Sequence, residues 1–193
     1  RTAARQKACK DGAVGRYSEQ KNRAAAADCT PGAAGKYNDQ AAQDAAGDCK
    51  NCATGLYNDQ TGQDAAGDCK NCVIGKFNDQ AAQDAATDCK DCAVGLYQDT
   101  AGQAACKNCA VGLYNDQSAQ DEAGDCKACA TGLYNDQAAQ DAAGDCKNCV
   151  IGKFNDQTGQ DAAGDCKDCA VGLYQDTAGQ AACKNCAVGL YND

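Results

Sequence analysis

Cysteine pairs that recur at short, regular intervals constrain this chain more than any other feature. From Cys49 onward a CxxC motif occurs eight times, and a GxY or GxF motif follows each copy. The 193 residues include 18 cysteines, but neither Trp nor Met, and only eight Tyr and two Phe. So few large apolar side chains cannot form one sizeable core, and covalent cross-links must replace it. The sequence predicts a small disulfide-rich repeat protein, with irregular or β-hairpin units stacked as an elongated, solenoid-like rod and little regular secondary structure.

The repeat is marked by aromatic residues spaced 20 residues apart, with two steps of 17. The larger period is therefore 77 residues, and segment 53–116 recurs as 130–193 with 59 of 64 positions identical. We divide the chain into divergent basic repeats with single cysteines (1–48), a first four-unit block (49–125) and a second, truncated block (126–193). We interpret the aromatic residues as structural, each capping the disulfide of its own or the next unit: Tyr17, Tyr37, Tyr57, Phe77, Tyr97, Tyr114, Tyr134, Phe154, Tyr174 and Tyr191.

Each unit combines extended and turn-forming segments. Residues 52–57 have a short extended pattern and residues 58–62 have turn chemistry, which together predict a small irregular hairpin. Residues 63–68 predict one helical turn that ends at Gly67. Gly55 and its equivalents are expected at positions with a positive φ angle or a close backbone approach.

Three chemistries compete for the CxxC motifs. Zinc sites use CxxC pairs at such spacings, but they need the motifs two by two, whereas these are evenly distributed with a shorter gap recurring. Thioredoxin-like redox chemistry needs one CxxC at a strand-to-helix turn. A disulfide that closes a loop of about 18 residues contributes about 3 kcal/mol, which a unit this small requires. We therefore interpret the cysteines as disulfide-forming, which places the chain outside the reducing cytosol, at the cell surface or beyond it.

Segment 92–109, with the sequence CAVGLYQDTAGQAACKNC, resembles the ephrin-receptor-like cysteine-rich repeat. Its CxxGxY opening is also similar to the first module of TNF-receptor-type repeats, and the resemblance covers nearly the whole chain. It implies that the cysteine before GxY pairs with the next cysteine along the chain. The implied disulfides are Cys52–Cys69, Cys72–Cys89, Cys92–Cys106, Cys109–Cys126, Cys129–Cys146, Cys149–Cys166 and Cys169–Cys183.

The front of the chain departs from this pattern, because Gly12 and Gly32 replace the second cysteine of the motif. A Cys9–Cys29 disulfide would leave Cys49 free, whereas a Cys29–Cys49 disulfide would leave Cys9 for another segment. A staggered scheme, in which Cys29 pairs with Cys52 and Cys49 with Cys72, also stays open. Cys186 would pair with a cysteine of a following unit. The candidates for unpaired or inter-unit cysteines are Cys9, Cys29, Cys49 and Cys186.

Charge is unevenly distributed along the chain. Residues 1–28 carry a net charge of +4 and the remainder −13, within a total of −9. A basic head and an acidic remainder suit a head-to-tail contact between identical subunits, for which Arg5, Arg16 and Arg23 are the candidate assembly residues. The acidic remainder and the lack of interleaved basic and aromatic residues argue against nucleic-acid binding.

The chain has no His, which removes His-dependent catalysis, and its nucleophiles and acids repeat uniformly, so we predict no catalytic residue and no enzyme. We predict no metal site and no cofactor. Calcium is the alternative, because Asp residues recur as Asp59, Asp64 and Asp68, although no EF-hand loop is present. The sequence has no NxS/T sequon, which excludes ordinary N-glycosylation within these residues. The hydroxyl groups of Thr54, Thr61, Thr100 and Ser118 are candidate sites for O-linked glycans.

No apolar run is long enough to cross a membrane. The chain stops partway through a unit, so we expect a partial or processed chain.

The most consistent function is structural: an extracellular subunit of a disulfide-stabilised filament, hair, stalk or surface layer that assembles head-to-tail with itself. The alternative is a cysteine-rich spacer in the ectodomain of a receptor or adhesin that binds a protein ligand.

Overall fold

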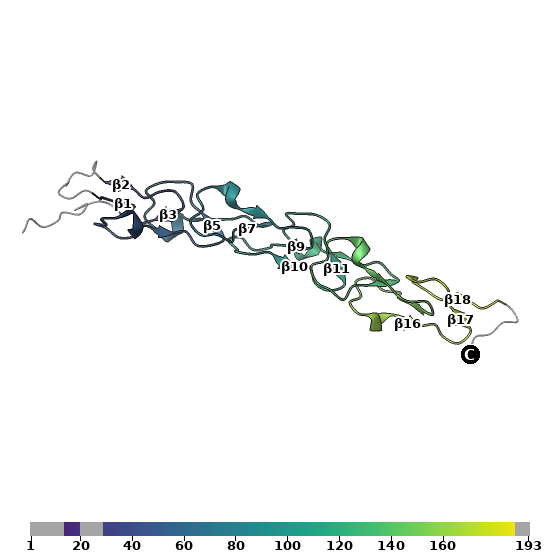
Figure 1. The fold of residues 1–193 in the computed structure, drawn as a ribbon. Helices are drawn as coiled ribbons and strands as arrows, with labels where there is room; N and C mark the ends of the chain where they lie inside the picture. Colours follow the sequence, from purple (N-terminus) through teal and green to yellow (C-terminus); the bar gives the residue numbers. More distant parts are fainter. Residues whose placement is uncertain (1–13, 20–28, 188–193) are drawn as a thin grey trace, which may run out of the picture. The chain divides into compact units, whose positions relative to one another are not determined.

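The computed structural model describes residues 14–19 and 29–187 (Figure 1). In this part the chain forms two-residue β-strands and three-residue 3₁₀ turns, and no α-helix. It folds as two compact units, Arg1–Lys90 with Thr100–Ala105, and Asp91–Asp99 with Cys106–Asp193. The sequence-based blocks with boundaries at 48 and 125 stay a prediction. No helix within the described residues has the length and apolar character that crossing a membrane requires.

The strands of the first unit are β1 (Arg16–Tyr17), β2 (Thr30–Pro31), β3 (Lys36–Tyr37), β4 (Lys50–Asn51), β5 (Leu56–Tyr57), β6 (Lys70–Asn71) and β7 (Lys76–Phe77), and the unit boundary falls within β8 (Lys90–Asp91). The second unit contains β9 (Leu96–Tyr97), β10 (Lys107–Asn108), β11 (Leu113–Tyr114), β12 (Lys127–Ala128), β13 (Leu133–Tyr134), β14 (Lys147–Asn148), β15 (Lys153–Phe154), β16 (Lys167–Asp168), β17 (Leu173–Tyr174) and β18 (Lys184–Asn185). The 3₁₀ turns are η2 (Ala46–Asp48), η3 (Ala66–Asp68), η4 (Ala86–Asp88), η5 (Ala123–Asp125), η6 (Ala143–Asp145) and η7 (Ala163–Asp165).

Each repeat is one antiparallel hairpin. In β5 and β6, Leu56 lies opposite Asn71 and Tyr57 opposite Lys70. The first strand is the xY or xF of the GxY motif, and the second is the dipeptide between the two cysteines of the next CxxC, or between Cys29 and Gly32 in β2. The same register occurs in β1–β2, β3–β4, β9–β10, β11–β12, β13–β14, β15–β16 and β17–β18. The prediction of small irregular hairpins is thus confirmed.

The predicted helical turn is shorter than expected. Only Ala66–Asp68 is helical, as the 3₁₀ turn η3, and Gly67 lies inside it instead of ending it. The carboxylate of Asp68 accepts hydrogen bonds from the backbone N–H groups of Asp64 and Ala65, at 3.1 and 2.9 Å. Because this side chain reaches back to the amides that precede the turn, it fixes the loop without a longer helix.

The core of the described residues contains no large aliphatic side chain. Every buried apolar residue in this part is a cysteine, whereas Val73, Ile151 and Val171 are 60%, 64% and 85% exposed. The buried polar side chains are Asn or Gln, with one Ser. Disulfides therefore replace a hydrophobic core, as the composition led us to expect, and buried side-chain amides, which we did not expect, accompany them.

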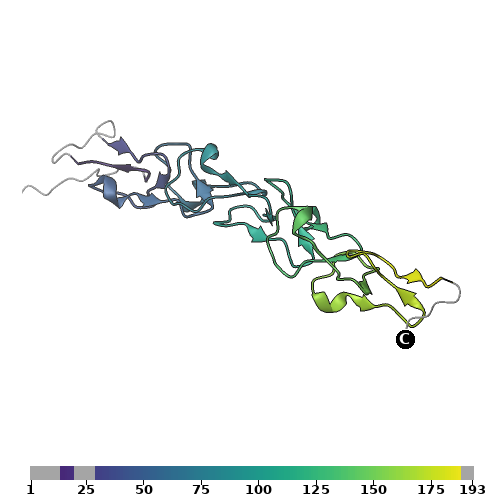
Figure 2. The same cartoon turned by 45° about the vertical axis from the view of Figure 1, so that its right-hand side comes forward.

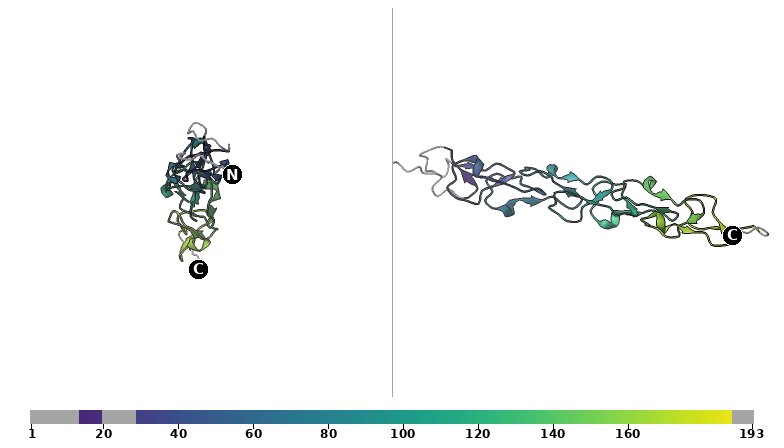
Figure 3. Two further views of the ribbon diagram at one scale, coloured as in Figure 1. Left: turned by 90° about the vertical axis from the view of Figure 1, so that its left-hand side faces the viewer. Right: turned by 60° about the horizontal axis from the view of Figure 1, so that its bottom comes forward.

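Within each unit the repeats follow one another in sequence order and bind their neighbours (Figures 2 and 3). The N–H of Gly55 donates to the carbonyl of Asn78 in the next repeat at 2.7 Å, and the N–H of Ala82 donates back to the carbonyl of Cys52 at 2.9 Å. A Cβ on Gly55 would lie 2.1 Å from the carbonyl oxygen of Gly102, two repeats later. Gly55 also has a φ of +81°, so both reasons predicted for its glycine are confirmed.

Candidate functional site

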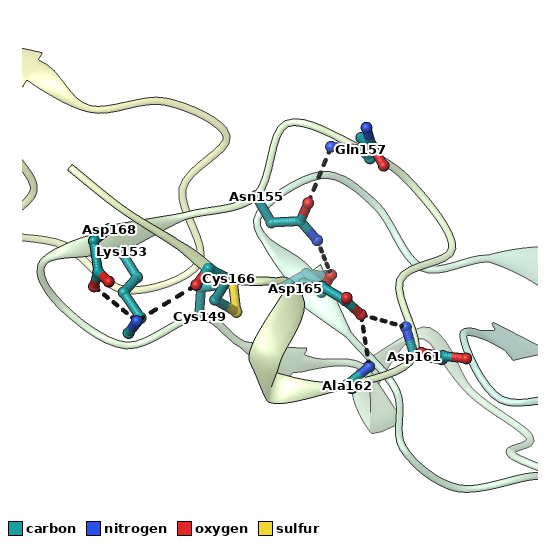
Figure 4. The surroundings of a disulfide bond; sticks show 10 residues. Cys149, Lys153, Asn155, Gln157, Asp161, Ala162, Asp165, Cys166 and Asp168 are labelled. Carbon is teal, nitrogen blue, oxygen red and sulfur yellow. Dashed lines mark hydrogen bonds and ion pairs between the residues drawn. A yellow bond between two sulfur atoms is a disulfide. The ribbon is translucent and has the colours of Figure 1, made fainter. Parts of the chain in front are cut away.

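The disulfides are the first element of the repeated site. In the CxxC motifs from Cys69/Cys72 to Cys166/Cys169, the two cysteines belong to successive disulfides, so these joints between repeats are fixed on both sides. Figure 4 shows one of them, Cys149–Cys166, beside its 3₁₀ turn. The described residues contain Cys52–Cys69, Cys72–Cys89, Cys92–Cys106, Cys109–Cys126, Cys129–Cys146, Cys149–Cys166 and Cys169–Cys183, which are the pairs that the resemblance implied.

The structure also decides among the pairings left open at the front. Cys29 is disulfide-bonded, whereas Cys49 is a free thiol and is buried. The Cys29–Cys49 disulfide and the staggered scheme are therefore wrong, because both would consume Cys49. Cys186 is free and half-buried, and Cys9 lies outside the described residues.

A buried asparagine is the second element, and it was missed from the sequence. Asn155 is 1% exposed. Its Nδ2 donates to the carbonyl of Leu133 in the preceding repeat at 2.8 Å, and its Oδ1 accepts from the N–H of Gln157 at 3.1 Å (Figure 4). Its own carbonyl accepts from the N–H of Gly132 at 2.7 Å. The same side chain ties each repeat to the one before it at Asn38, Asn58, Asn78, Asn115, Asn135 and Asn155.

The shorter, 17-residue repeats use glutamine at this position. Gln175 is 4% exposed, and its Nε2 donates to the carbonyl of Ala182 at 2.6 Å, while its Oε1 accepts from the N–H of Thr177 at 3.1 Å. The longer side chain therefore satisfies its amide within its own, shorter loop. At the front the position is Ser18, whose buried hydroxyl has no hydrogen-bond partner. The signal that could have revealed this position is the amide that follows every aromatic residue from Tyr37 onward.

Replacing Asn135 with Ala is expected to destabilise its repeat by about 2–4 kcal/mol. The change leaves the carbonyl of Leu113 and the N–H of Gln137 without the partner that they share in a partly buried place. Amide hydrogen exchange of residues 136–145 measures the loss. The exposed side chain of Gln137 provides the control, since Gln137→Ala should change exchange little; equal effects of both variants would contradict a structural role for the buried amide.

Lysine, aspartate and aromatic residues form a third, exposed element. Lys70, on the second strand of the hairpin, donates to the carboxylate of Asp59 at 2.7 Å, and its Nζ lies 6.0 Å from the centre of the Tyr57 ring. Equivalent ion pairs of 2.6–2.7 Å occur at Lys50–Asp39, Lys90–Asp79, Lys127–Asp116, Lys147–Asp136 and Lys167–Asp156, and Lys107–Asp99 is paired as well. The arrangement places a cation over one face of the ring, which the sequence analysis did not anticipate.

The aromatic residues were predicted to cap disulfides, and this stays a prediction; two of them share a hollow with a half-cystine. Tyr57 lines a shallow hollow of about 140 Å³ together with Cys89, a half-cystine of the next repeat, and Val73. Tyr134 and Cys166 line the equivalent hollow 77 residues later. Tyr17, Tyr37, Phe77, Tyr97, Tyr114, Phe154 and Tyr174 lie on the first strands of their hairpins, and Tyr191 lies outside the described residues.

The Asp59–Lys70 pair predicts the pH range over which this ion pair stabilises its repeat. The hydrogen bond from Lys70 lowers the pKa of Asp59 and the same bond raises the pKa of Lys70. The contribution of the carboxylate is present above its unfolded pKa of about 4 and is lost as pH falls through the lowered value. The contribution of the ammonium is present below its unfolded pKa of about 10.4 and is lost as pH rises through the raised value.

We therefore expect a stability plateau between about pH 5 and 10 with small losses on either side. Carboxyl NMR titration of Asp59 tests the cause, because Lys70→Gln should return the pKa of Asp59 to its ordinary range. An unchanged titration in the variant would contradict the assignment to Lys70.

Comparison with known families identifies the architecture. The family model described as "Tyrosine-protein kinase ephrin type A/B receptor-like" matches residues 80–122 and 159–193. In these two segments the chain is similar to ephrin-receptor-like cysteine-rich repeats. No curated protein matches the sequence. Ephrin-receptor-like repeats are a non-catalytic module typical of extracellular domains, and the many disulfides agree with that setting.

The remaining candidate residues have the following positions in the structure. The carboxylates considered for calcium are separated in function, since Asp59 binds Lys70 and Asp68 binds backbone amides. Within residues 14–19 and 29–187, no three carboxylate or thiol ligands converge on a metal position. Arg16 donates from Nη1 to the carbonyl of Cys29 at 3.0 Å, whereas Arg5 and Arg23 lie outside the described residues. The four hydroxyl residues considered for O-linked sugar are all exposed, at Thr54, Thr61, Thr100 and Ser118.

Proposed function

We propose that this chain is a structural extracellular protein, a subunit of a disulfide-stabilised filament, hair, stalk or surface layer. The observation that carries the proposal is the way neighbouring repeats bind one another. The contacts use backbone groups and the buried Asn, as in Gly132 to Asn155 and Asn155 to Leu133. These groups are common to successive repeats, so repeats can be added without redesign of a core.

The uniform surface supports the same proposal. The two blocks differ at five of 64 compared positions, all exchanges among Ala, Thr and Gly. A surface that recognises one protein partner concentrates aromatic and Arg side chains at one place. Here the ten aromatic residues are distributed one to a repeat, and those with a described cation contact are covered by the lysine of their own hairpin.

We further propose that copies associate head-to-tail through charge, with the basic segment 1–28 of one copy against the acidic surface of another. O-linked glycans on exposed Thr and Ser are part of this proposal. Charge reversal of Arg5 and Arg23 tests the association. Arg16 is kept, because its bond to the Cys29 carbonyl would confound a loss of assembly with a loss of folding.

Electron microscopy and sedimentation velocity over a range of concentrations read out the result. The unmodified chain should form concentration-dependent filaments that shorten in high salt, and the doubly reversed variant should sediment as a monomer. A double variant, Lys127→Glu with Lys147→Glu, reverses two paired lysines outside the basic segment; it provides the charge-matched control and should still assemble. A chain that stays monomeric at all concentrations and salt levels would overturn self-assembly.

The second candidate function is a spacer in the ectodomain of a receptor or adhesin. The match to the ephrin-receptor-like model favours it, because this module is typical of extracellular domains. Monomeric behaviour together with intact, protease-resistant repeats would support the spacer.

A further inference from the structure

The repeat that begins at Gly32 lacks the disulfide that closes the later repeats, although Gly32 and Cys49 lie where the two half-cystines would be. Position 32 corresponds to the half-cystine that begins each loop from Cys52 to Cys169, as Cys109 does with Cys126, but it is Gly32. Its would-be partner, Cys49, is a free thiol with 5% exposure. A Cβ built on Gly32 would lie 3.1 Å from the Sγ of Cys49. The thiol therefore still points at the place from which a second cysteine would reach it.

Two independent features weaken the same region. The preceding repeat has Ser18 where the others carry a buried amide, and the hydroxyl of Ser18 has no hydrogen-bond partner. The loop of the uncross-linked repeat contains Ala42 at a φ of +62°, a conformation that costs a non-glycine residue about 1–2 kcal/mol. Other repeats tolerate such an alanine, for example Ala119 at +59°, but there a disulfide, Cys109–Cys126, closes the loop.

Non-covalent contacts alone hold this repeat closed. Lys36 and Tyr37 pair with Asn51 and Lys50 in the β3–β4 hairpin. The N–H of Asn38 donates to the carbonyl of Gln63 in the next repeat at 2.9 Å. Such contacts can open locally at a fraction of the cost of global unfolding, whereas a disulfide limits how far the neighbouring loops can open.

We propose that residues 33–51 form a built-in opening point, the first segment of the first unit to unfold, and that its opening uncovers the Cys49 thiol. In the closed state burial raises the pKa of Cys49, so the thiol is both covered and a weak nucleophile. Opening removes both restrictions at once. The device does not depend on the proposed assembly, since it belongs to one repeat of one chain.

Alkylation by a maleimide tests the device on the full chain with Cys186→Ser, with the labelled cysteine located by mass spectrometry. We expect Cys49 to react in low urea, while the backbone amides of residues 53–69 keep their protection from hydrogen exchange. Residues 33–51 should exchange on the order of 100-fold faster than residues 53–69.

Two variants make the test decisive. Gly32→Cys should form the missing disulfide with Cys49 and slow exchange of residues 33–51 on the order of 100-fold. Cys109→Gly copies the natural defect 77 residues later, and its freed Cys126 should become labelled in similarly low urea. The proposal is overturned if Cys49 reacts only together with loss of protection in residues 53–69, or if Cys126 in Cys109→Gly stays unreactive until the second unit unfolds. The Cys109→Gly result stands even if Gly32→Cys pairs incorrectly.

Discussion

Full reduction of the disulfides is expected to unfold both units, abolishing amide protection across residues 52–183. The buried apolar residues of the described chain are all cysteines, so no hydrophobic core remains to hold the repeats once the S–S bonds are broken. Each loop closure contributes about 3 kcal/mol. The two disulfides in the described part of the first unit therefore contribute about 6 kcal/mol and the five of the second about 15 kcal/mol, which is comparable to the 5–15 kcal/mol that typically stabilises a whole domain.

Hydrogen exchange before and after reduction measures this effect, with complete reduction verified by mass. A sample alkylated without reductant is the control and should keep its protection, and reoxidation should restore the reduced sample. A local version removes one bridge, in the double variant Cys149→Ser with Cys166→Ser, which should speed exchange of residues 150–165 on the order of 100-fold. A fully reduced chain that keeps native protection would show that backbone contacts alone suffice.

Much of the fold could be read from the sequence because its strongest determinants are local. Glycine at position 55 and the turn residues that follow it constrain the backbone within a few residues. A hairpin closed by a disulfide, such as Cys52–Cys69, lies within a single repeat period. Repetition further constrained the prediction, because one local structure had to be compatible with ten copies of the pattern.

The buried amide could not be read in the same way. Asn58 follows an aromatic residue and precedes Asp59 and Gln60, a composition that indicates an exposed turn. Its burial depends on the next and the preceding repeats, since its side chain binds the carbonyl of Lys36 and its backbone N–H binds Gln83. Its partner lies 22 residues away, so the local composition indicates an exposed turn, and only the recurrence of an amide after each aromatic residue marks the position in the sequence.

The cysteines at the front show a related limit. Three cysteines, Cys9, Cys29 and Cys49, could form only one disulfide among themselves, and spacing alone could not select it. Cys29 and Cys49 are equally buried, at 6% and 5% exposure, so burial does not distinguish them. In the structure Cys29 is disulfide-bonded, and Cys49 is a free thiol beside Gly32.

Replacing Gly132 with Ala is expected to destabilise the second unit by about 3–5 kcal/mol, the largest loss from any single substitution considered. The position has a φ of +83°. A Cβ there would lie 2.2 Å from the carbonyl oxygen and 2.5 Å from the carbonyl carbon of Gly179. These are backbone atoms of a loop two repeats later, which cannot rotate away as a side chain would.

Gly152→Ala provides a nearly ideal control in the same unit. Gly152 has a φ of +84°, but a Cβ there would meet nothing within 4 Å. The two alanines therefore share the cost of the left-handed backbone, about 1–2 kcal/mol, and differ only in the contact with the later repeat. Gly144→Ala, which has open space and no positive φ, should be close to neutral.

Hydrogen exchange shows where the extra loss arises. The N–H of Gly179 donates to the carbonyl of Cys149 at 2.9 Å, so a Cβ at position 132 that displaces Gly179 also breaks this bond between repeats. Gly132→Ala should therefore speed exchange in residues 176–182, nearly 50 residues away in the sequence, whereas Gly152→Ala should leave them unchanged. Equal losses in the two variants would mean that backbone conformation alone requires glycine, and that each repeat is held by its immediate neighbours without the contact to the repeat after next.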